Sequence, residues 1–492
     1  MILNEEQILV LKEIEKFFKS NKKVFILKGY AGTGKTTILN KIIEKNPSYN
    51  YILLASTGVA AKVMEKKMSM KSNTIHSNIY KYSLLEEIEK DSYKLVFNTK
   101  KHSEMYEELN IYIIDEASMI SNEKFVKEEW LEFGSSKLLK DTLKKIKIER
   151  ENTKVILVGD PIQLPPVGFE ESCALNKNYI EKNFNISCEE FLLTKVERQS
   201  NDNSIVKESL KIRKAINDNA KYVIEADNKN IFFVNRDEAI NIFLKNINET
   251  AFITKSNKNT MLYSNIIRKK LGYDNNYYRT GEKLLVISNN YKYDLMNGEI
   301  LFLNKDTNIE DIEEKEIEIN NKIYKLKFIK TSIKKEDDSI VSVLMLLNFL
   351  DDKDYPDDRK VISDCLIKIS MEDMKSKENF SESKYYNALQ VRLGYSITCH
   401  KSQGNEFKNV ILEYTNPKNN FDLKWLYTGI TRAREKLYIL CDNQNNFRDN
   451  KKLNQKNKKN KIKQIIKKKL IFSFEERKEQ KQLIRKKLIF NN

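Results

Sequence analysis

The sequence predicts an α/β protein built on parallel β-sheets. Apolar runs at 24–28, 111–114 and 155–158 have the length of buried strands, and a helical segment at 37–44 follows the first of them. Strands that are apolar along their whole length are typical of parallel sheets that helices cover on both faces. The alternation of such strands with helices predicts parallel α/β domains, and 492 residues suffice for about three of them.

A glycine-rich loop follows the first apolar run. Residues 29–36 read Gly-Tyr-Ala-Gly-Thr-Gly-Lys-Thr, which is the P-loop pattern in its strand–loop–helix context. Backbone N–H groups and the helix N-terminus of such a loop bind phosphate oxygens. We expect Lys35 to contact the β- and γ-phosphates of ATP, and the Thr36 hydroxyl to bind Mg²⁺. The expected ATP-binding residues here are Gly29, Gly32, Thr33, Gly34, Lys35, Thr36 and Thr37.

Two carboxylates follow the second apolar run. Ile-Tyr-Ile-Ile at 111–114 leads directly to Asp115 and Glu116. Paired with a P-loop, Asp115 is expected to hold Mg²⁺ and Glu116 to activate the attacking water. An isolated match of this kind is often only a strand that leaves the core.

The third apolar run leads to a stiff loop. Residues 159–166 read Gly-Asp-Pro-Ile-Gln-Leu-Pro-Pro and contain three of the six prolines. The Gln163 amide is expected to hydrogen-bond the γ-phosphate, and a surface polar residue is the alternative interpretation.

The net charge of +17 is concentrated at the C-terminus. Residues 451–492 hold sixteen Lys or Arg and three Glu, or +13, so the first 450 residues carry only +4. A basic segment is typical of proteins that bind polyanions, although an AT-rich genome also favours Lys, Asn and Ile.

Composition argues against several classes of protein. The five cysteines are scattered and have no ligand spacing with the three histidines, so neither a zinc site nor a disulfide framework is predicted. Residues 1–23 are charged throughout, and no apolar run approaches the ~18 residues that a membrane span needs. We therefore expect no membrane association and a cytoplasmic location.

Further short segments occur together with these motifs, in the following order along the chain. They are 4–7 (Asn-Glu-Glu-Gln), 55–61 (Ala-Ser-Thr-Gly-Val-Ala-Ala), 74–77 (Thr-Ile-His-Ser), 193–199 (Leu-Thr-Lys-Val-Glu-Arg-Gln), 252–257, 395–406 and 427–434. With them, the chain resembles superfamily 1 helicases over most of residues 4–440. The resemblance is strongest to the 5′→3′ branch that includes the phage Dda helicase and RecD-like proteins.

The resemblance implies roles for residues outside the P-loop. Gln7 would read the adenine, Glu406 would hold the ribose, and Arg198 and Arg432 would approach the γ-phosphate. Taken alone, either arginine could instead form a surface ion pair worth roughly 0–1 kcal/mol. The implied catalytic set is Lys35, Thr36, Asp115, Glu116, Gln163, Arg198 and Arg432.

The resemblance also implies contacts with single-stranded DNA through hydroxyl, amide, imidazole and lysine side chains. Phe97 is a candidate wedge that separates strands at single-strand/duplex junctions, although a hydrophobic anchor explains it equally well. The other candidates are Thr57, His76, Ser77, Thr254, Asn257, Thr398, His400, Lys401 and Ser402.

The motif order implies four parts. Residues 1–200 would form one RecA-like motor domain with a short hairpin insertion at 78–110, and residues 201–285 with 388–446 a second. Residues 286–387, rich in short strand-like pieces, would form a small SH3-like β-barrel. Residues 447–492 would form a basic tail.

These features predict an ATP-dependent DNA helicase or translocase acting in replication, recombination or repair, and a monomeric motor. The compact insertions favour 5′→3′ movement by family analogy. The alternatives are a motor that acts on RNA and a non-motor nucleic-acid-binding protein with a degenerate ATPase.

The tail contains an internal repeat. Lys-Lys-Leu-Ile-Phe at 468–472 recurs at 486–490, a spacing that places both apolar clusters on one face of a continuous helix. The tail could be a basic arm for nucleic acid, a peptide that docks on a replication partner, or a disordered extension.

Overall fold

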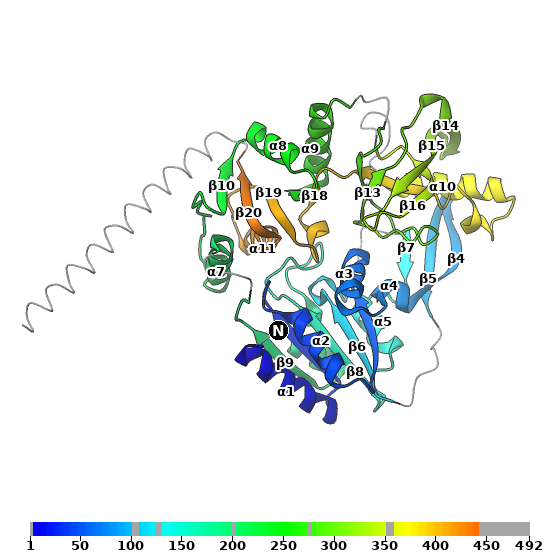
Figure 1. The fold of residues 1–492 in the computed structure, drawn as a ribbon. Helices are drawn as coiled ribbons and strands as arrows, with labels where there is room; N and C mark the ends of the chain where they lie inside the picture. Colours follow the sequence, from blue (N-terminus) through cyan, green and yellow to red (C-terminus); the bar gives the residue numbers. More distant parts are fainter. Residues whose placement is uncertain are drawn as a thin grey trace, which may run out of the picture.

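The computed structural model describes residues 3–100, 108–123, 130–197, 203–273, 278–350 and 359–441. Figure 1 shows two sheet-centred lobes, with a separate strand-rich body beside the second lobe. The α/β class predicted from the sequence is confirmed, because each lobe is built around a parallel sheet.

The first lobe is a six-stranded parallel sheet in the order β3-β2-β6-β8-β1-β9. Its strands are β1 (Val24–Gly29), β2 (Asn50–Ala55), β3 (Ser72–Thr74), β6 (Asn110–Asp115), β8 (Thr153–Gly159) and β9 (Cys188–Leu193). Its helices are α1 (Glu5–Lys19), α2 (Lys35–Lys45), α3 (Gly58–Met68), α4 (Ile75–Ile79), α5 (Leu138–Lys145) and α6 (Lys177–Phe184).

Strand β1 shows why these apolar runs lie in the middle of the lobe. Val24 and Ile26 pack into a core on one face of the sheet, and Phe25 and Leu27 pack into a second core on the other face. Alternate side chains of a strand point to opposite faces, so a strand with helices on both sides must be apolar throughout.

The second lobe is a five-stranded parallel sheet in the order β10-β20-β19-β11-β18. Its strands are β10 (Ile231–Val234), β11 (Thr250–Thr254), β18 (Ile397–Thr398), β19 (Phe407–Glu413) and β20 (Ala433–Leu440). Its helices are α7 (Ser204–Asn217), α8 (Arg236–Lys245), α9 (Asn257–Lys270) and α11 (Asn420–Ile430).

The strand-rich body lies between β11 and β18 in sequence. It consists of β12 (Lys283–Val286), β13 (Ile300–Leu303), β14 (Ile312–Ile319), β15 (Lys322–Lys334), β16 (Ile340–Leu346) and β17 (Leu389–Leu393). The order is β13-β12-β17-β16-β15-β14, and a further β13–β15 pairing closes five strands into a ring. Strands β12 and β17 extend this body beyond the expected limits of 286 and 387, because both pair with its other strands.

The body also holds a helix that the strand-like sequence pattern did not predict, α10 (Arg359–Met374). It lies between β16 and β17, which pair in parallel. Parallel neighbours need a long crossover between them, and a helix is the usual form of such a crossover.

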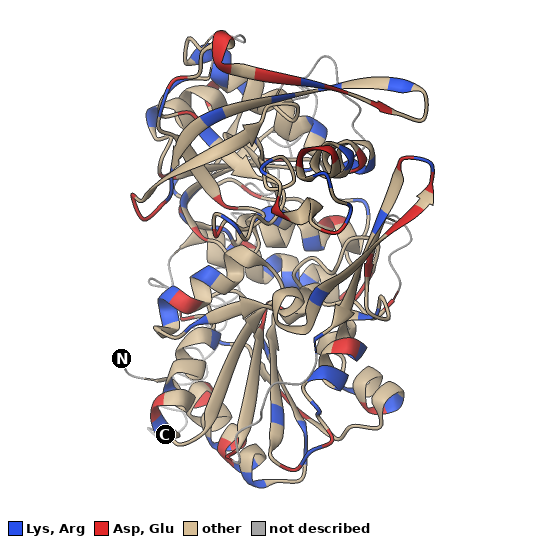
Figure 2. Ribbon diagram, turned by 90° about the vertical axis from the view of Figure 1, so that its right-hand side faces the viewer, with Lys and Arg blue, Asp and Glu red and all other residues tan. Residues whose placement is uncertain are grey.

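A β-hairpin projects from the first lobe within the expected insertion. Strands β4 (Tyr80–Glu89) and β5 (Ser92–Thr99) pair in antiparallel fashion, and β7 (Leu131–Phe133) joins β5. The hairpin lies against α10 (Figures 1 and 2), where the Tyr93 N–H donates to Asp364 Oδ1 at 2.9 Å. Lys368 and Asp91 form an ion pair at 2.8 Å, so charged groups anchor the hairpin near its tip.

Five short 3₁₀ segments complete the described structure: η1 (Ala117–Met119), η2 (Cys173–Leu175), η3 (Ile309–Asp311), η4 (Phe380–Glu382) and η5 (His400–Ser402). Within the described ranges, none of the helices has the length and apolar character that crossing a membrane requires.

Candidate active site

The P-loop connects β1 to α2 at the carboxyl end of β1 in the first sheet. Gly34 precedes α2 with a left-handed φ of 83°, and a Cβ there would lie 2.4 Å from Gln7 Nε2, so the position requires glycine. Gln7 Nε2 also donates to the Thr33 carbonyl at 3.2 Å. Lys35 Nζ donates to the carbonyls of Gly29 and Tyr30 at 2.6 and 3.2 Å, so its ammonium lies over the loop that would receive phosphates.

The carboxylate pair follows β6, two strands away from β1 in the sheet. Glu116 has a φ of 50°, a left-handed conformation that costs roughly 1–3 kcal/mol for a residue other than glycine. The Glu116 N–H donates to Asp115 Oδ1 at 2.8 Å. Strained backbone of this kind is concentrated at functional sites because the surrounding structure must hold it.

The electrostatics of the pair suit proton transfer. Burial raises the pKa of both carboxyl groups, and the neighbouring Asp115 contributes to raising the pKa of Glu116 to about 7. Arg432 and Lys35 act in the opposite direction, because positive charge favours the ionised carboxylate. A carboxyl group with a pKa near neutral pH is well matched to general base catalysis.

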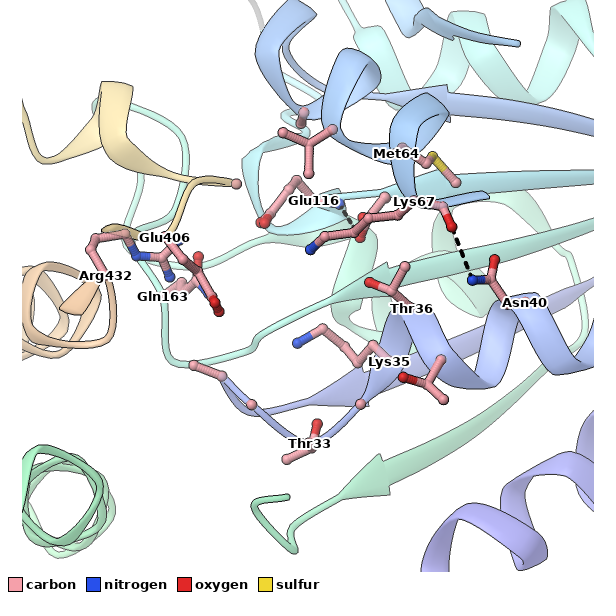
Figure 3. A pocket seen from close by; sticks show the side chains of 18 residues that line it. Thr33, Lys35, Thr36, Asn40, Met64, Lys67, Glu116, Gln163, Glu406 and Arg432 are labelled. Carbon is pink, nitrogen blue, oxygen red and sulfur yellow. Dashed lines mark hydrogen bonds between the residues drawn. The ribbon is translucent and has the colours of Figure 1, made fainter. Parts of the chain in front are cut away.

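A cavity of about 370 Å³ lies between the lobes and contains these groups. Figure 3 shows Lys35, Thr36 and Glu116 on one side, with Gln163, Glu406 and Arg432 facing them. Gln163 is 5% exposed, and its buried Oε1 has no hydrogen-bond partner among the described residues. An unpartnered buried oxygen is costly unless a ligand or water satisfies it, so this amide is available to a bound group.

Arg432 lies between α11 and β20 and is 4% exposed. Its Nε donates to the Thr428 carbonyl at 3.0 Å and its Nη1 to the Asn405 carbonyl at 3.1 Å. Its Nη2 donates to Thr431 Oγ1 at 3.2 Å. Three bonds from one guanidinium fix its plane at the edge of the cavity.

Two family comparisons agree with this two-lobed site. Residues 2–230 match the PIF1-like helicase family, and residues 393–440 match the UvrD-like helicase C-terminal domain. The first match covers the first lobe and reaches α7 of the second lobe, and the second match covers β18 to β20. Both matches support the resemblance to superfamily 1 helicases.

Relatives of the helicase include uncharacterized protein R530 of Acanthamoeba polyphaga mimivirus, 26% identical over 90% of this chain and 100% of that protein. RecBCD enzyme subunit RecD of Buchnera aphidicola subsp. Schizaphis graminum is 28% identical, over 85% of this chain and 70% of that protein. The crystal structure of Pif1 helicase from Bacteroides with ADP-AlF3 and ssDNA has a TM-score of 0.45 and 18% identity, covering 89% and 92% of the two chains.

The structure brings most predicted ATP-site residues of the helicase together. Gly29 and Gln7 do not line the cavity: Gly29 accepts from Lys35 at the start of the P-loop, and Gln7 donates to the Thr33 carbonyl of that loop. Arg198 lies outside the described residues. The predicted residues that line the cavity are Gly32, Thr33, Gly34, Lys35, Thr36, Thr37, Asp115, Glu116, Gln163, Glu406 and Arg432.

Two of the predicted DNA contacts are wrong for the side chains concerned. Thr254 and Ser402 are both fully buried. The Thr254 hydroxyl lies 2.7 Å from that of Thr260, and the Ser402 hydroxyl donates to the Cys399 carbonyl at 2.7 Å. These side chains stabilise turns at the ends of β11 and β18 and cannot reach a nucleic acid.

Other predicted DNA-contact residues lie at the N-termini of helices. Thr57 caps α3 by accepting from the Ala60 N–H, and Thr74 caps α4 by accepting from the Ser77 N–H. His76 packs beside Tyr80 and Phe133, and burial lowers its pKa to about 4, so its imidazole is neutral at physiological pH.

Phe97 has the contacts of a hydrophobic anchor. Its ring stacks on Phe133 with a centroid distance of 4.6 Å and meets Tyr82 edge-on. It packs against the core of the first lobe at the base of the hairpin, so the anchor interpretation is favoured over the wedge.

The other predicted residues of the second lobe lie nearer to solvent. Asn257 is exposed at the start of α9, and Thr398, His400 and Lys401 are partly exposed at and after the end of β18. His400 Nε2 is buried with no hydrogen-bond partner among the described residues. Burial and the nearby guanidinium groups of Arg359 and Arg392 lower the pKa of Lys401 to about 8.

Sequence analysis missed several residues at the site. Lys67 and Asn40 line the cavity (Figure 3), and no local motif marks them, because only packing decides which side of a helix faces the nucleotide. Asp160 and Tyr427 lie inside segments identified from the sequence, 159–166 and 427–434. Their pairing across the two lobes depends on tertiary structure alone.

Proposed function

We propose that this chain is an ATP-dependent DNA helicase or translocase that moves on single-stranded DNA. The observation that carries the proposal is the composition of the cavity. The P-loop and Glu116 come from the first lobe, and Arg432 and Glu406 come from the second. A nucleotide between the lobes would favour their closed arrangement, and its hydrolysis would release them.

The residues present fit ATP and Mg²⁺. The Thr36 hydroxyl and the Asp115 carboxylate are hard oxygen ligands, which Mg²⁺ prefers, and both line the cavity. When bound there, the ion would offset charge on the β- and γ-phosphates. The unpartnered Gln163 Oε1 can accept a hydrogen bond from the attacking water.

The chain's own residues supply the chemistry. Glu116 would accept the proton of the attacking water, since its carboxyl has a pKa near neutral pH. Lys35 would leave its loop carbonyls for phosphate oxygens, which are stronger acceptors. Arg432 would stabilise charge that develops on the γ-phosphate, and its three hydrogen bonds hold it ready for that role.

A path for DNA is supported by the ends of the parallel strands. Thr57 follows β2, Asn257 follows β11, Thr398 ends β18 and Lys401 follows it. In open parallel sheets, ligands bind at the carboxyl ends of the strands, and these polar residues mark that edge in both lobes. Lys401 with Arg359 and Arg392 forms a local positive cluster, which suits a phosphate backbone and requires no base sequence.

Direction and domain roles are part of the proposal. We assign 5′→3′ movement, an SH3-like character to the ring of five strands, and a strand-separating role to the hairpin β4–β5. RecA-like motor domains would occupy about residues 1–200 and about 201–285 with 388–446. The basic residues 447–492 lie outside the described residues, and we propose that they bind nucleic acid, with a replication partner as the alternative.

Unwinding of two partial duplexes tests the function and the direction together. One substrate carries a 5′ single-stranded tail and the other a 3′ tail, each with ATP and Mg²⁺. We expect unwinding of the 5′-tailed substrate only. Unwinding of the 3′-tailed duplex alone would reverse the polarity, and ATP hydrolysis without unwinding of either would contradict the helicase assignment.

The two alternatives have their own measurements. Stimulation of ATP hydrolysis by single-stranded RNA but not by DNA would show a motor that acts on RNA. A degenerate ATPase would not hydrolyse ATP at all, which the intact Lys35, Asp115, Glu116 and Arg432 argue against.

A further inference from the structure

Tyr427 forms a hydrogen-bonded link between the two lobes. It lies in α11 of the second lobe and is 1% exposed. Its hydroxyl accepts from the Ala31 N–H at 3.2 Å and donates to Asp160 Oδ2 at 2.9 Å. Both partners belong to the first lobe. A single oxygen atom of the second lobe therefore contacts two loops of the first lobe.

Each of these loops forms part of the ATP site. Ala31 lies in the P-loop and lines the cavity. Asp160 begins the loop after β8, where its Oδ1 accepts from the Ile162 N–H at 3.0 Å. Gln163 follows Ile162 in this loop, and its amide faces the cavity. The Tyr427 hydroxyl therefore restrains both the phosphate-binding turn and the loop that carries this glutamine.

The Tyr427 hydroxyl remains a hydrogen-bond donor at physiological pH. Burial and the neighbouring Asp160 raise the pKa of Tyr427 well above its usual value. The proton stays on the phenol, and the Asp160 side chain, which is 1% exposed, keeps a hydrogen-bond partner. Loss of the hydroxyl would leave the partly buried Ala31 N–H and one oxygen of the buried Asp160 without this partner.

The next residue in α11 reinforces the same connection. Thr428 Oγ1 accepts from the Leu164 N–H at 3.0 Å, while the Thr428 carbonyl accepts from Arg432 Nε at 3.0 Å. Gln403 Nε2 donates to the Leu164 carbonyl at 3.1 Å. The end of α11 thus holds the β8 loop on one side and the cavity arginine on the other.

The P-loop has a second contact with the second lobe next to this one. The Arg213 guanidinium of α7 lies 3.7 Å from the centroid of the Tyr30 ring. Tyr30 directly precedes Ala31, so two neighbouring residues of the P-loop are held by α7 and α11. A cation over an aromatic face is attractive, so this contact adds to the restraint that the tyrosine link places on the P-loop.

We propose that Tyr427 is a positioning residue for hydrolysis, which fixes Gln163 through Asp160 and fixes Arg432 through the end of α11. The inference rests on the proposed ATPase function, because it concerns the geometry of that site. Tyr427 does not line the cavity, so it acts through other residues and does not touch the nucleotide.

The test compares wild type, Tyr427→Phe, Arg432→Ala and the double variant in the full chain, with single-turnover ATP hydrolysis in the presence of single-stranded DNA. We expect Tyr427→Phe to slow hydrolysis by about tenfold or more, with nucleotide affinity changed by less than about threefold. If the phenol acts through the arginine, Tyr427→Phe should have a much smaller effect in the Arg432→Ala background, because the two losses are then not independent.

Tyr414→Phe is the matched control. Tyr414 is buried in the same core cluster, and its hydroxyl has no hydrogen-bond partner among the described residues. This variant should hydrolyse ATP within about twofold of wild type, as expected for a residue without a role in the site. If Tyr427→Phe does not fold, Asp160→Asn tests the same bond from its other partner, with the same expected dependence on Arg432.

Each outcome supports or overturns the inference. Wild-type hydrolysis by Tyr427→Phe would overturn it, whereas losses that simply multiply in the double variant would overturn the route through Arg432. An equal loss in Tyr414→Phe would mean that any buried hydroxyl of this core has the same effect. Absence of hydrolysis in the wild type would instead contradict the proposed function itself.

Discussion

The ionisation of Glu116 predicts how hydrolysis depends on pH. Burial and the adjacent Asp115 raise the pKa of Glu116 to about 7. A general base must be ionised, so activity is lost as the pH falls through this value and gained as it rises. About one tenth of the carboxyl groups are ionised at pH 6 and about nine tenths at pH 8, which predicts a roughly ninefold rise in rate.

The assay is kcat/KM for ATP between pH 5.5 and 9, at constant ionic strength, with Mg²⁺ and saturating single-stranded DNA. This parameter reports the ionisation of the enzyme before it binds nucleotide. Glu116→Gln is the companion variant, and its residual activity should not show the rise. Arg432→Ala should move the midpoint to higher pH, because the guanidinium favours the ionised carboxylate.

Two results would refute this reasoning. A wild-type kcat/KM that changes less than about twofold between pH 6 and 8 would show that no group with this pKa limits the reaction. The same midpoint in wild type and Glu116→Gln would assign the ionisation to another group.

Three further predictions concern the arginine, the fold and the tail. Arg432→Ala should lower turnover by about 10³–10⁵-fold with little change in nucleotide binding, and wild-type turnover would reject the assignment. Glu282→Ala should lower the free energy of unfolding by about 3–5 kcal/mol, because it leaves the buried Arg268, 2.7 Å away, without its charge partner. The exposed pair Lys41–Glu44 is the control, and Glu44→Ala should leave the free energy of unfolding nearly unchanged in chemical denaturation. Deletion of 447–492 should flatten the salt dependence of DNA binding by about 0.7 in log–log slope per lost phosphate contact, and an unchanged slope would exclude the basic-arm interpretation.

Tertiary structure corrected the sequence-based predictions where side-chain direction matters. Thr254 and Ser402 belong to segments that resemble DNA-contact motifs, yet both are fully buried. Helix α10 and strand β17 were likewise not assigned to the strand-rich body. Short segments do not show which neighbours will pack against them, so burial and strand pairing cannot be deduced from the segments themselves.

The sequence by itself determined the sites whose chemistry is local. The P-loop, the two carboxylates and Gln163 each follow an apolar run, and β1, β6 and β8 form where those runs lie. Backbone N–H groups, a lysine and a strand end make such motifs recognisable within about ten residues. Only the tertiary structure decided that Arg432 faces Glu116 across a cavity and that Tyr427 bonds to Ala31 and Asp160. Those contacts join residues hundreds of positions apart, and they exist because two separately packed sheets meet at their edges.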